Sequence, residues 1–195
     1  SHNKKTVDSI NKKKTNEYLK GIKLPKNLIA TSDFKKLVDC NYFFIATPTQ
    51  HTSSIIRRFR KYKISQNFII CSKGIEIKSG KFLSQVVKEI FPKSNIAILS
   101  GPCFADEVAK ELPTAVLLAS KKKRFFNEIS KLVYKKNFRL YYSDDILGCQ
   151  LGGAIKNVYA IGAGIVSGLK LGENARSAFI SRSFAEILRL SKSIG

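Results

Sequence analysis

The sequence of 195 residues contains no Met and no Trp, and it has few acidic side chains, with 14 Asp and Glu against 35 Lys and Arg. Because no initiator Met is present, we expect the chain to be a piece of a longer protein. Residues 1–14 are polar and contain no apolar stretch of the length that a signal peptide needs. The content of 44% apolar and 25% charged residues argues against intrinsic disorder.

Cysteine is also scarce. The four cysteines, at positions 40, 71, 103 and 149, form no Cys-x-x-Cys pair. Their wide spacing fits neither a zinc framework nor a dense disulfide scaffold. We therefore expect a reducing, cytoplasmic compartment and no metal site.

The shortage of acidic residues leaves a formal net charge of +21. A basic domain of this kind has the charge to bind phosphate backbones, so a nucleic-acid-binding module is one hypothesis. Long apolar segments separate the basic clusters, which lie at 12–14, 57–61, 121–124 and 135–136. No zinc-finger spacing, aromatic RNA-binding motif or basic zipper accompanies them. Because charge runs are usually solvated faces, we expect no nucleic-acid partner.

Short apolar runs alternate with amphipathic ones over the first three quarters of the chain. The short runs predict strands at 42–46, 68–71, 96–100, 115–119 and, as a more polar edge strand, 138–142. The amphipathic runs predict helices at 52–63, 81–91, 104–111 and 124–135. This alternation predicts an α/β fold with a Rossmann-like, doubly wound, mainly parallel sheet, whose ligands lie beyond the carboxyl ends of the strands.

The character of the sequence changes at about residue 145. Residues 151–169 are apolar or small, and residues 173–190 form an amphipathic helical pattern. A membrane span is an alternative for 151–169, but Lys156 and Asn157 favour a helix of a globular core. We expect residues 1–144 to form the sheet domain, incomplete at its N-terminus, and 145–195 to begin a helical domain.

Lys156 lies in a helix that is apolar on nearly every side, which predicts that the lysine is buried. Burial lowers the pKa of a lysine and prepares it to exchange protons near neutral pH. The alternative is a lysine that reaches the surface or pairs with Asp144 or Asp145. The residues alone leave both possibilities open.

Two predicted strands end in residues suited to an anion. Lys73 follows the strand 68–71, and Gly101 follows the strand 96–100 within the turn SGPCFAD. Glycine allows a ligand to approach the backbone, and the N-terminus of the next helix presents free N–H groups. A Gly-Pro pair is more often simple turn punctuation, so the argument depends on the two strand ends together.

Four motifs resemble the bacterial type of NAD(P)-dependent glycerol-3-phosphate dehydrogenase. They are SGPCFA at 100–105, ELPTA at 111–115, LGGAIKNV at 151–158 and GENAR at 172–176. The similarity includes 18–33 and 45–48 and so extends over the chain. It implies an oxidoreductase that interconverts dihydroxyacetone phosphate and sn-glycerol 3-phosphate for phospholipid synthesis, with NAD or NADP as cofactor. A relative of the 6-phosphogluconate dehydrogenase group is the alternative.

The resemblance assigns catalysis to Lys156. In the family this lysine takes the proton of the hydroxyl at carbon 2 as hydride leaves for the nicotinamide, and Asn157 helps to orient the reacting groups. The partner implied is a small phosphorylated substrate, and a homodimer is one expected assembly.

The resemblance also assigns the binding residues. Lys73 matches a lysine that touches substrate and cofactor, Gly101 and Cys103 match the turn that contacts the substrate, and Ala105 matches a cofactor contact. His2 matches the end of a strand at the cofactor ribose, where an acidic residue would select NAD; none is present, so we expect the 2′-phosphate of NADP to be tolerated. The alternative for His2 is a solvent-exposed terminal residue.

The chain departs from the family pattern in three ways. At 103 the family usually has Ser or Thr, and a thiol is a weaker hydrogen-bond donor. The Gly-x-Gly-x-x-Gly fingerprint is absent from the sequence, and so is a later Asp with a Ser-Arg-Asn run that grips the substrate phosphate. We therefore expect the isolated chain to be inactive.

Overall fold

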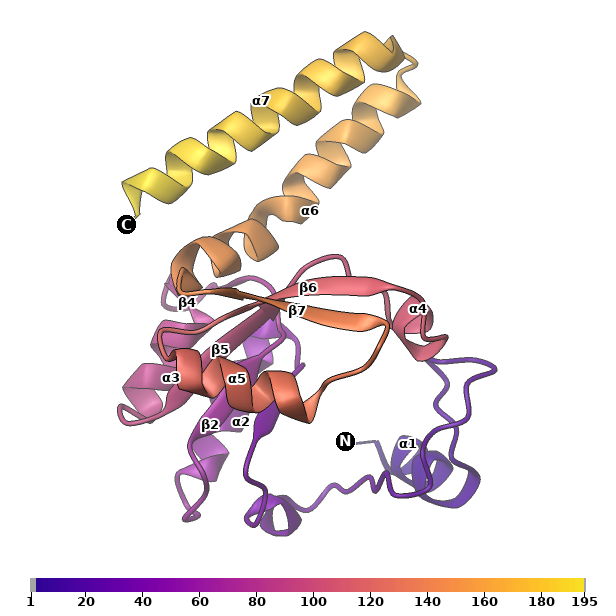
Figure 1. Cartoon of the computed structure of the whole chain (residues 1–195), viewed down its shortest axis with the longest axis vertical. Helices are drawn as coiled ribbons and strands as arrows, with labels where there is room; N and C mark the ends of the chain where they lie inside the picture. Colours follow the sequence, from indigo (N-terminus) through magenta and orange to yellow (C-terminus); the bar gives the residue numbers. More distant parts are fainter. Residues whose placement is uncertain (1–2, 195) are drawn as a thin grey trace.

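Five apolar runs form one sheet in the computed structural model, which describes residues 3–194 (Figure 1). The strand order is β1-β2-β5-β6-β7. The bounds are Phe43–Ile45 for β1, Asn67–Ile70 for β2, Asn95–Ser100 for β5, Thr114–Ala119 for β6 and Phe138–Ser143 for β7. Each of these strands overlaps one that the sequence predicted, and β7 lies at the edge as expected.

Helices cover both faces of the sheet. On one face, α2 (Thr49–Phe59) and α3 (Leu83–Ile90) pack on Phe68 and Ile70, and on the other α5 (Lys123–Leu132) packs on Ile69. These three β2 side chains are fully buried, as is typical of a strand covered on both faces. The predicted Rossmann-like arrangement of a mainly parallel sheet between helices is confirmed.

One strand pair is antiparallel within this mainly parallel sheet. β1, β2 and β5 are parallel, but β6 pairs antiparallel with β5 and is followed by a parallel β7. The connection between β5 and β6 contains only the short helix α4 (Ala105–Ala109), and β6 starts near the edge where β5 ends. The rule that ligands gather at carboxyl ends therefore applies here to β1, β2 and β5.

Several short elements were not predicted. Two-residue strands, β3 (Ile75–Glu76) and β4 (Lys81–Phe82), form a small antiparallel hairpin. The N-terminal segment contains α1 (Lys4–Asp8), the π-helical turn η1 (Ser9–Lys13) and the 3-10 turn η2 (Phe34–Leu37). Figure 1 shows α1 set apart from the sheet. Paired hydrogen bonds of 2.9 and 2.8 Å between the Asn11 amide and the Ala30 backbone tie this segment together.

Two long antiparallel helices follow the sheet, α6 (Ile146–Gly168) and α7 (Gly172–Ser193). The Asp145 carboxylate caps α6 by accepting from the Gly148 N–H at 2.8 Å. In α6 only Cys149, Gln150, Leu151 and Gly153, all in its first part, are buried. That part packs against β5 and β6, so the beginning of α6 is anchored to the sheet.

The prediction that this apolar helix is buried on every side is wrong. Val158 and Ile161 each expose 65% of their surface. Figure 1 shows α6 and α7 projecting together away from the sheet. Among the described residues, the outer part of α6 has only α7 to pack against, and one neighbouring helix covers only one side. No helix in 3–194 combines the length and apolarity required to cross a bilayer.

Candidate active site

The carboxyl ends of β1, β2 and β5 bring Lys73 and Gly101 together. The Lys73 ammonium donates to the Gly101 carbonyl oxygen at 3.4 Å. Thr49, the first residue of α2, holds the Lys73 backbone because its hydroxyl donates to the Lys73 carbonyl oxygen at 2.7 Å. Lys73 is exposed, so its charge is available to a ligand at this edge.

Gly101 is required by the geometry of its turn. Its φ is +149°, and a Cβ at this position would lie 3.1 Å from the Val116 Cα on β6. A side chain would therefore be strained and would crowd the neighbouring strand. The glycine keeps the backbone carbonyl within reach of Lys73.

Helix α6 approaches these strand ends at Gly153. A Cβ at Gly153 would lie 3.3 Å from the Ser100 hydroxyl oxygen and 3.5 Å from the Lys73 Cγ. A narrow recess lies between this part of α6 and the strand ends, lined by Ser72–Gly74, Ile98–Ser100, Cys149, Gln150 and Gly153. Glycine thus allows the helix to lie against both predicted strand-end segments.

Lys156 follows Gly153 by three residues, so it lies on the same side of α6 one turn further out. Its side chain is exposed, and its ammonium donates to the Asn157 side-chain oxygen at 2.9 Å. The predicted burial of Lys156 is therefore not observed, because α6 leaves the sheet before this turn. No carboxylate in the described part of the chain forms an ion pair with it, and Asp145 instead caps the helix.

The turn after Gly101 is open. Cys103 is exposed, and so is Ala105, the first residue of the five-residue helix α4. Asp106 and Glu107 occupy the first turn of this helix, and their charges already complement its positive end. An anion at this edge therefore depends on Lys73 rather than on α4. His2 lies outside the described residues.

Two cysteine thiols near the site, those of Cys71 and Cys149, have a raised pKa. Burial raises the pKa of Cys71 to about 11; the nearby Cys103 raises this pKa as well, and Lys73 lowers it. Burial likewise raises the pKa of Cys149 to about 11, to which Asp145 contributes. All four cysteines are free.

Sequence reasoning missed a buried polar pair beside the site. The Gln150 side chain donates to the Ser84 hydroxyl oxygen at 2.8 Å and accepts from the Ser84 backbone N–H at 3.0 Å. Both residues are buried. A glutamine within an otherwise apolar helix start was the available signal, because buried amides need hydrogen-bond partners.

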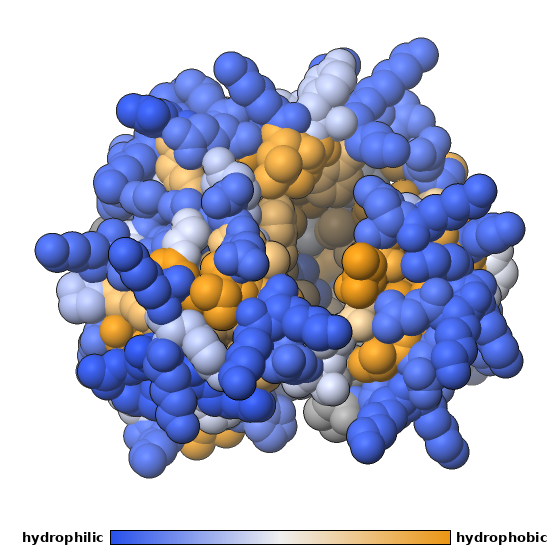
Figure 2. Space-filling model, turned by 90° about the horizontal axis from the view of Figure 1, so that it is seen from below, coloured by the Kyte–Doolittle hydropathy of each residue, from blue (hydrophilic) through white to orange (hydrophobic). Residues whose placement is uncertain are grey.

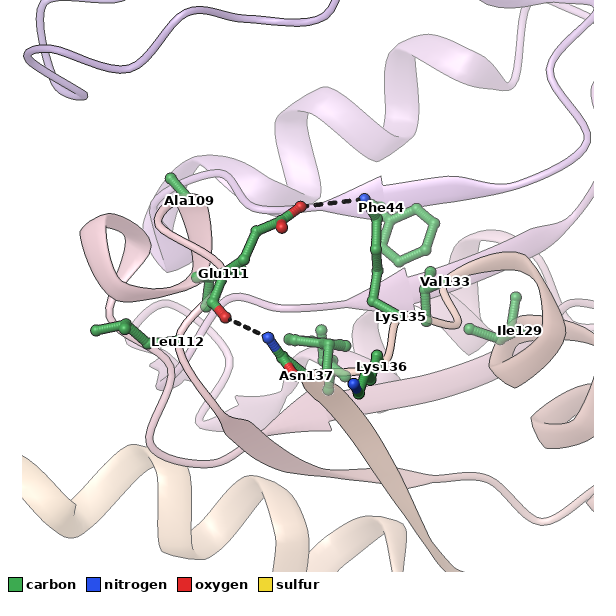
Figure 3. Close-up of a pocket in the computed structure, with 12 residues that line it drawn as sticks. Phe44, Ala109, Glu111, Leu112, Ile129, Val133, Lys135, Lys136 and Asn137 are labelled. Carbon is green, nitrogen blue, oxygen red and sulfur yellow. Dashed lines mark hydrogen bonds and ion pairs between the residues drawn. The ribbon is translucent and has the colours of Figure 1, made fainter.

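A cavity larger than the recess at the candidate site lies elsewhere, on the α5 face of the sheet. Figure 2 shows a hollow with apolar walls, and Figure 3 shows Phe44, Val133 and Ile129 around it. At its rim the Lys135 ammonium lies 3.4 Å from a Glu111 carboxylate oxygen, and the Asn137 amide donates to the Glu111 carbonyl oxygen at 2.8 Å. None of the predicted site residues lines this cavity.

Comparison with known proteins gives one family. The model described as NAD-dependent glycerol-3-phosphate dehydrogenase N-terminus matches residues 1–126, and the corresponding C-terminus model matches 145–195. A glycerol-3-phosphate dehydrogenase [NAD(P)+] of Erythrobacter litoralis is 43% identical over 91% of this chain and 53% of its own length. One of Zymomonas mobilis is 43% identical over 97% of this chain and 55% of its length.

Solved structures agree with these matches. A 2.1 Å crystal structure of glycerol-3-phosphate dehydrogenase from Coxiella burnetii superposes with a TM-score of 0.93 at 34% identity, covering 100% of this chain and 61% of that one. The structure of the enzyme from Saccharomyces cerevisiae gives a TM-score of 0.84 at 29% identity, covering 96% of this chain and 57% of that one. The chain spans about half the length of the curated relatives it matches.

Proposed function

Because the chain belongs to the NAD-dependent glycerol-3-phosphate dehydrogenase family, as its motifs indicated, we propose that it forms part of an enzyme that interconverts dihydroxyacetone phosphate and sn-glycerol 3-phosphate. The observation that carries the proposal is the convergence of Lys73, Gly101 and the LGGAIKNV helix at one sheet edge. The product would supply phospholipid synthesis.

Lys156 is the proposed acid and base. It takes the proton from the hydroxyl at carbon 2 during oxidation and returns it to the carbonyl oxygen during reduction. Its hydrogen bond to Asn157 supports an orienting role for that amide. The exposure of Lys156 leaves its ammonium open to a substrate entering from the sheet edge.

Lys73 supplies positive charge for the phosphorylated substrate, and the turn that contains Gly101 and Cys103 forms the adjoining wall. The hydrogen bond from Lys73 to the Gly101 carbonyl supports this grouping. We assign Ala105, at the start of α4, to the cofactor side of the same turn.

The cofactor of this proposal is NAD or NADP, which accepts or supplies the hydride. The open strand ends and the close backbone turn at Gly101 fit the reacting end of a dinucleotide. The sequence contains no Gly-x-Gly-x-x-Gly loop for a pyrophosphate, so these residues fit only that end. We also propose His2, followed by Lys4 and Lys5, as a contact that accommodates the 2′-phosphate of NADP.

We propose that the chain comprises two domains. The boundary between the cofactor domain, 1–144, and the helical substrate domain, 145–195, lies at the Asp145 cap. Four free cysteines support a cytoplasmic location. A homodimer is the proposed assembly, and light scattering tests it.

The full-length protein that carries this chain is the enzyme to assay. Dihydroxyacetone phosphate should drive NADPH or NADH oxidation, and Lys156→Ala should lower kcat by about 10²–10⁴-fold, because the proton donor is lost. Lys156→Arg should fail similarly, because a guanidinium does not exchange its proton. The fall in NAD(P)H absorbance with time measures these rates.

Lys192→Ala, which removes an exposed lysine from α7, should retain turnover. The binding of NADPH, followed by its fluorescence, should be nearly unchanged in Lys156→Ala. Retained turnover in Lys156→Ala would overturn the assignment of this lysine. A wild-type enzyme that oxidises NADPH with a 2-oxo acid, and not with dihydroxyacetone phosphate, would overturn the substrate.

A further inference from the structure

The outer side of the sheet carries a second candidate surface. β7 pairs with β6, and its other edge is unpaired among the described residues. A groove runs from the end of α5 along this edge, and its lining includes Tyr134, Lys135, Lys136, Arg139 and Tyr141. We call it the β7 groove. It contains none of the residues assigned above to the dehydrogenase site.

The β7 groove carries more positive charge than its one ion pair compensates. The stretch from Ser130 to Ser143 contains four basic residues and no Asp or Glu. Lys135 is paired with Glu111 at 3.4 Å, but both side chains remain 71% exposed, and such pairs are weak. Within 3–194, neither Lys136 nor Arg139 forms an ion pair. The groove thus has cations free to meet an anionic chain.

The groove also presents two aromatic rings to solvent. Tyr134 is 77% exposed and Tyr141 is 56% exposed. The rings of Phe126 and Tyr142, in contrast, pack against each other and against the Lys123 ammonium. The two tyrosines lining the groove therefore have faces on which a planar group can stack.

We propose that the β7 groove binds single-stranded nucleic acid. Bases stack on exposed aromatic rings in a sequence-tolerant way, while Lys and Arg follow the phosphates, and this combination is what the groove offers. The carboxylates of an acidic peptide would pair with the cations and make no stacking contact with either ring. The sequence suggested only a solvated basic run at 135–136, because it does not show that Tyr134 and Tyr141 share one groove with those lysines.

The recess around Tyr18 shows why an exposed tyrosine alone does not make a nucleic-acid site. Tyr18 is 78% exposed and has lysines nearby, but its recess is also lined by Glu17 and Asp106. The two carboxylates would repel phosphates there. Tyr18 is therefore a matched control for the tyrosines of the β7 groove.

Fluorescence anisotropy of the 195-residue chain with labelled oligo-dT and oligo-rU of about 15 nucleotides tests the proposal. Tyr134→Ala with Tyr141→Ala should weaken binding about 30-fold or more, at about 1 kcal/mol or more for each stacked base, and leave the salt dependence unchanged, since stacking is lost and charge is kept. The double Phe variant should bind like wild type. Lys136→Ala with Arg139→Ala should instead reduce the slope of log K against log salt by about 1.4, at about 0.7 per phosphate contact.

Two control variants separate the groove from general charge. Tyr18→Ala should bind like wild type, and Lys12→Ala with Lys13→Ala should change the affinity far less than Lys136→Ala with Arg139→Ala. The proposal would be overturned if the Lys12/Lys13 double variant lost as much affinity as the Lys136/Arg139 double variant. It would also be overturned if the double Tyr→Ala variant lost no affinity. Binding to phosphatidylserine vesicles without binding to the oligonucleotides would overturn it as well.

The relative affinity for the DNA and RNA probes identifies the type of strand that the groove binds. The test needs no dehydrogenase activity, so it fails or succeeds independently of the proposed enzyme.

Discussion

Burial keeps the thiols of Cys71 and Cys149 protonated well above neutral pH. It raises the pKa of each from 9.0 to about 11. A thiol whose pKa is higher in the folded state than in the unfolded state contributes stability that is fully present below the unfolded pKa and is lost as pH rises toward the folded pKa. The sign of the effect on stability follows from these two values.

The unfolded state releases the thiol protons near pH 9, whereas the folded state holds them until about pH 11. Ionisation therefore stabilises the unfolded state first, and the free energy of unfolding should fall as pH rises through this window. Between pH 8 and pH 10 the expected loss is about 1 kcal/mol for each cysteine. Urea unfolding of the wild type, Cys71→Ala and Cys149→Ala at both pH values measures it.

Cys40, which is exposed, provides the control for this pH dependence. Cys40→Ala should lose as much stability between pH 8 and pH 10 as the wild type does. Cys71→Ala and Cys149→Ala should each lose about 1 kcal/mol less than the wild type over the same range. An unchanged pH dependence in Cys71→Ala and Cys149→Ala would contradict the prediction.

At the scale of elements, Gln150 connects α6 to α3. Its amide makes two hydrogen bonds with Ser84, which lies in the first turn of α3, and donates to the Ile146 carbonyl oxygen at 3.2 Å. The N–H groups at the start of a helix have no partner within the helix. A residue 66 positions further along the chain satisfies one of them here, so the beginning of α6 is fixed relative to the sheet.

Gln150→Leu should therefore destabilise the fold. Leucine fills a similar volume but leaves the buried Ser84 N–H and hydroxyl without these partners, and each such loss costs about 1–3 kcal/mol. Gln85→Ala is the control, because exposed Gln85 accepts from the Phe82 N–H at 2.9 Å on the same helix and its loss should cost about 1 kcal/mol or less. Equal urea midpoints for the two variants would contradict the role of Gln150.

The elements differ in how well the sequence predicts them. The strand at Phe68 to Ile70 is predictable because a strand buried on both faces needs a continuous apolar run. The pair β3 and β4 is not, since two residues cannot display a period. The direction of β6 depends on where α4 turns the chain, and the residues 115–119 would look the same in a parallel or an antiparallel strand.

The candidate site likewise has features that the sequence predicts and features that it does not. Lys73 and Gly101 are predictable because they immediately follow recognisable strands. The exposure of Lys156 is not, since burial depends on what packs against α6 rather than on the composition of α6. Gly153 and Lys73 line one recess although they are 80 positions apart, and one sequence contains no signal of such a pairing.

At the scale of the whole molecule, charge is the dominant feature. The net charge of +21 is spread over a surface on which the described ion pairs, such as Arg124 with Glu128, all have side chains at least 40% exposed. Exposed pairs contribute about 0–1 kcal/mol each. Repulsion among the remaining cations acts across the surface and opposes the compact state.

Screening should therefore stabilise this protein. Raising NaCl from about 0.05 M to 0.5 M shortens the Debye length from about 14 Å to 4 Å, which weakens repulsion between distant cations more than attraction within close pairs. We expect the free energy of unfolding to rise by roughly 1 kcal/mol and then to level off. Urea unfolding across this range measures the change. Sucrose serves as the control, because it stabilises by exclusion from the protein surface and not by screening of charges. Its effect should therefore continue to rise with sucrose concentration, whereas the effect of NaCl levels off. A fall in stability with added NaCl would show that the exposed ion pairs outweigh the repulsion of the excess cations.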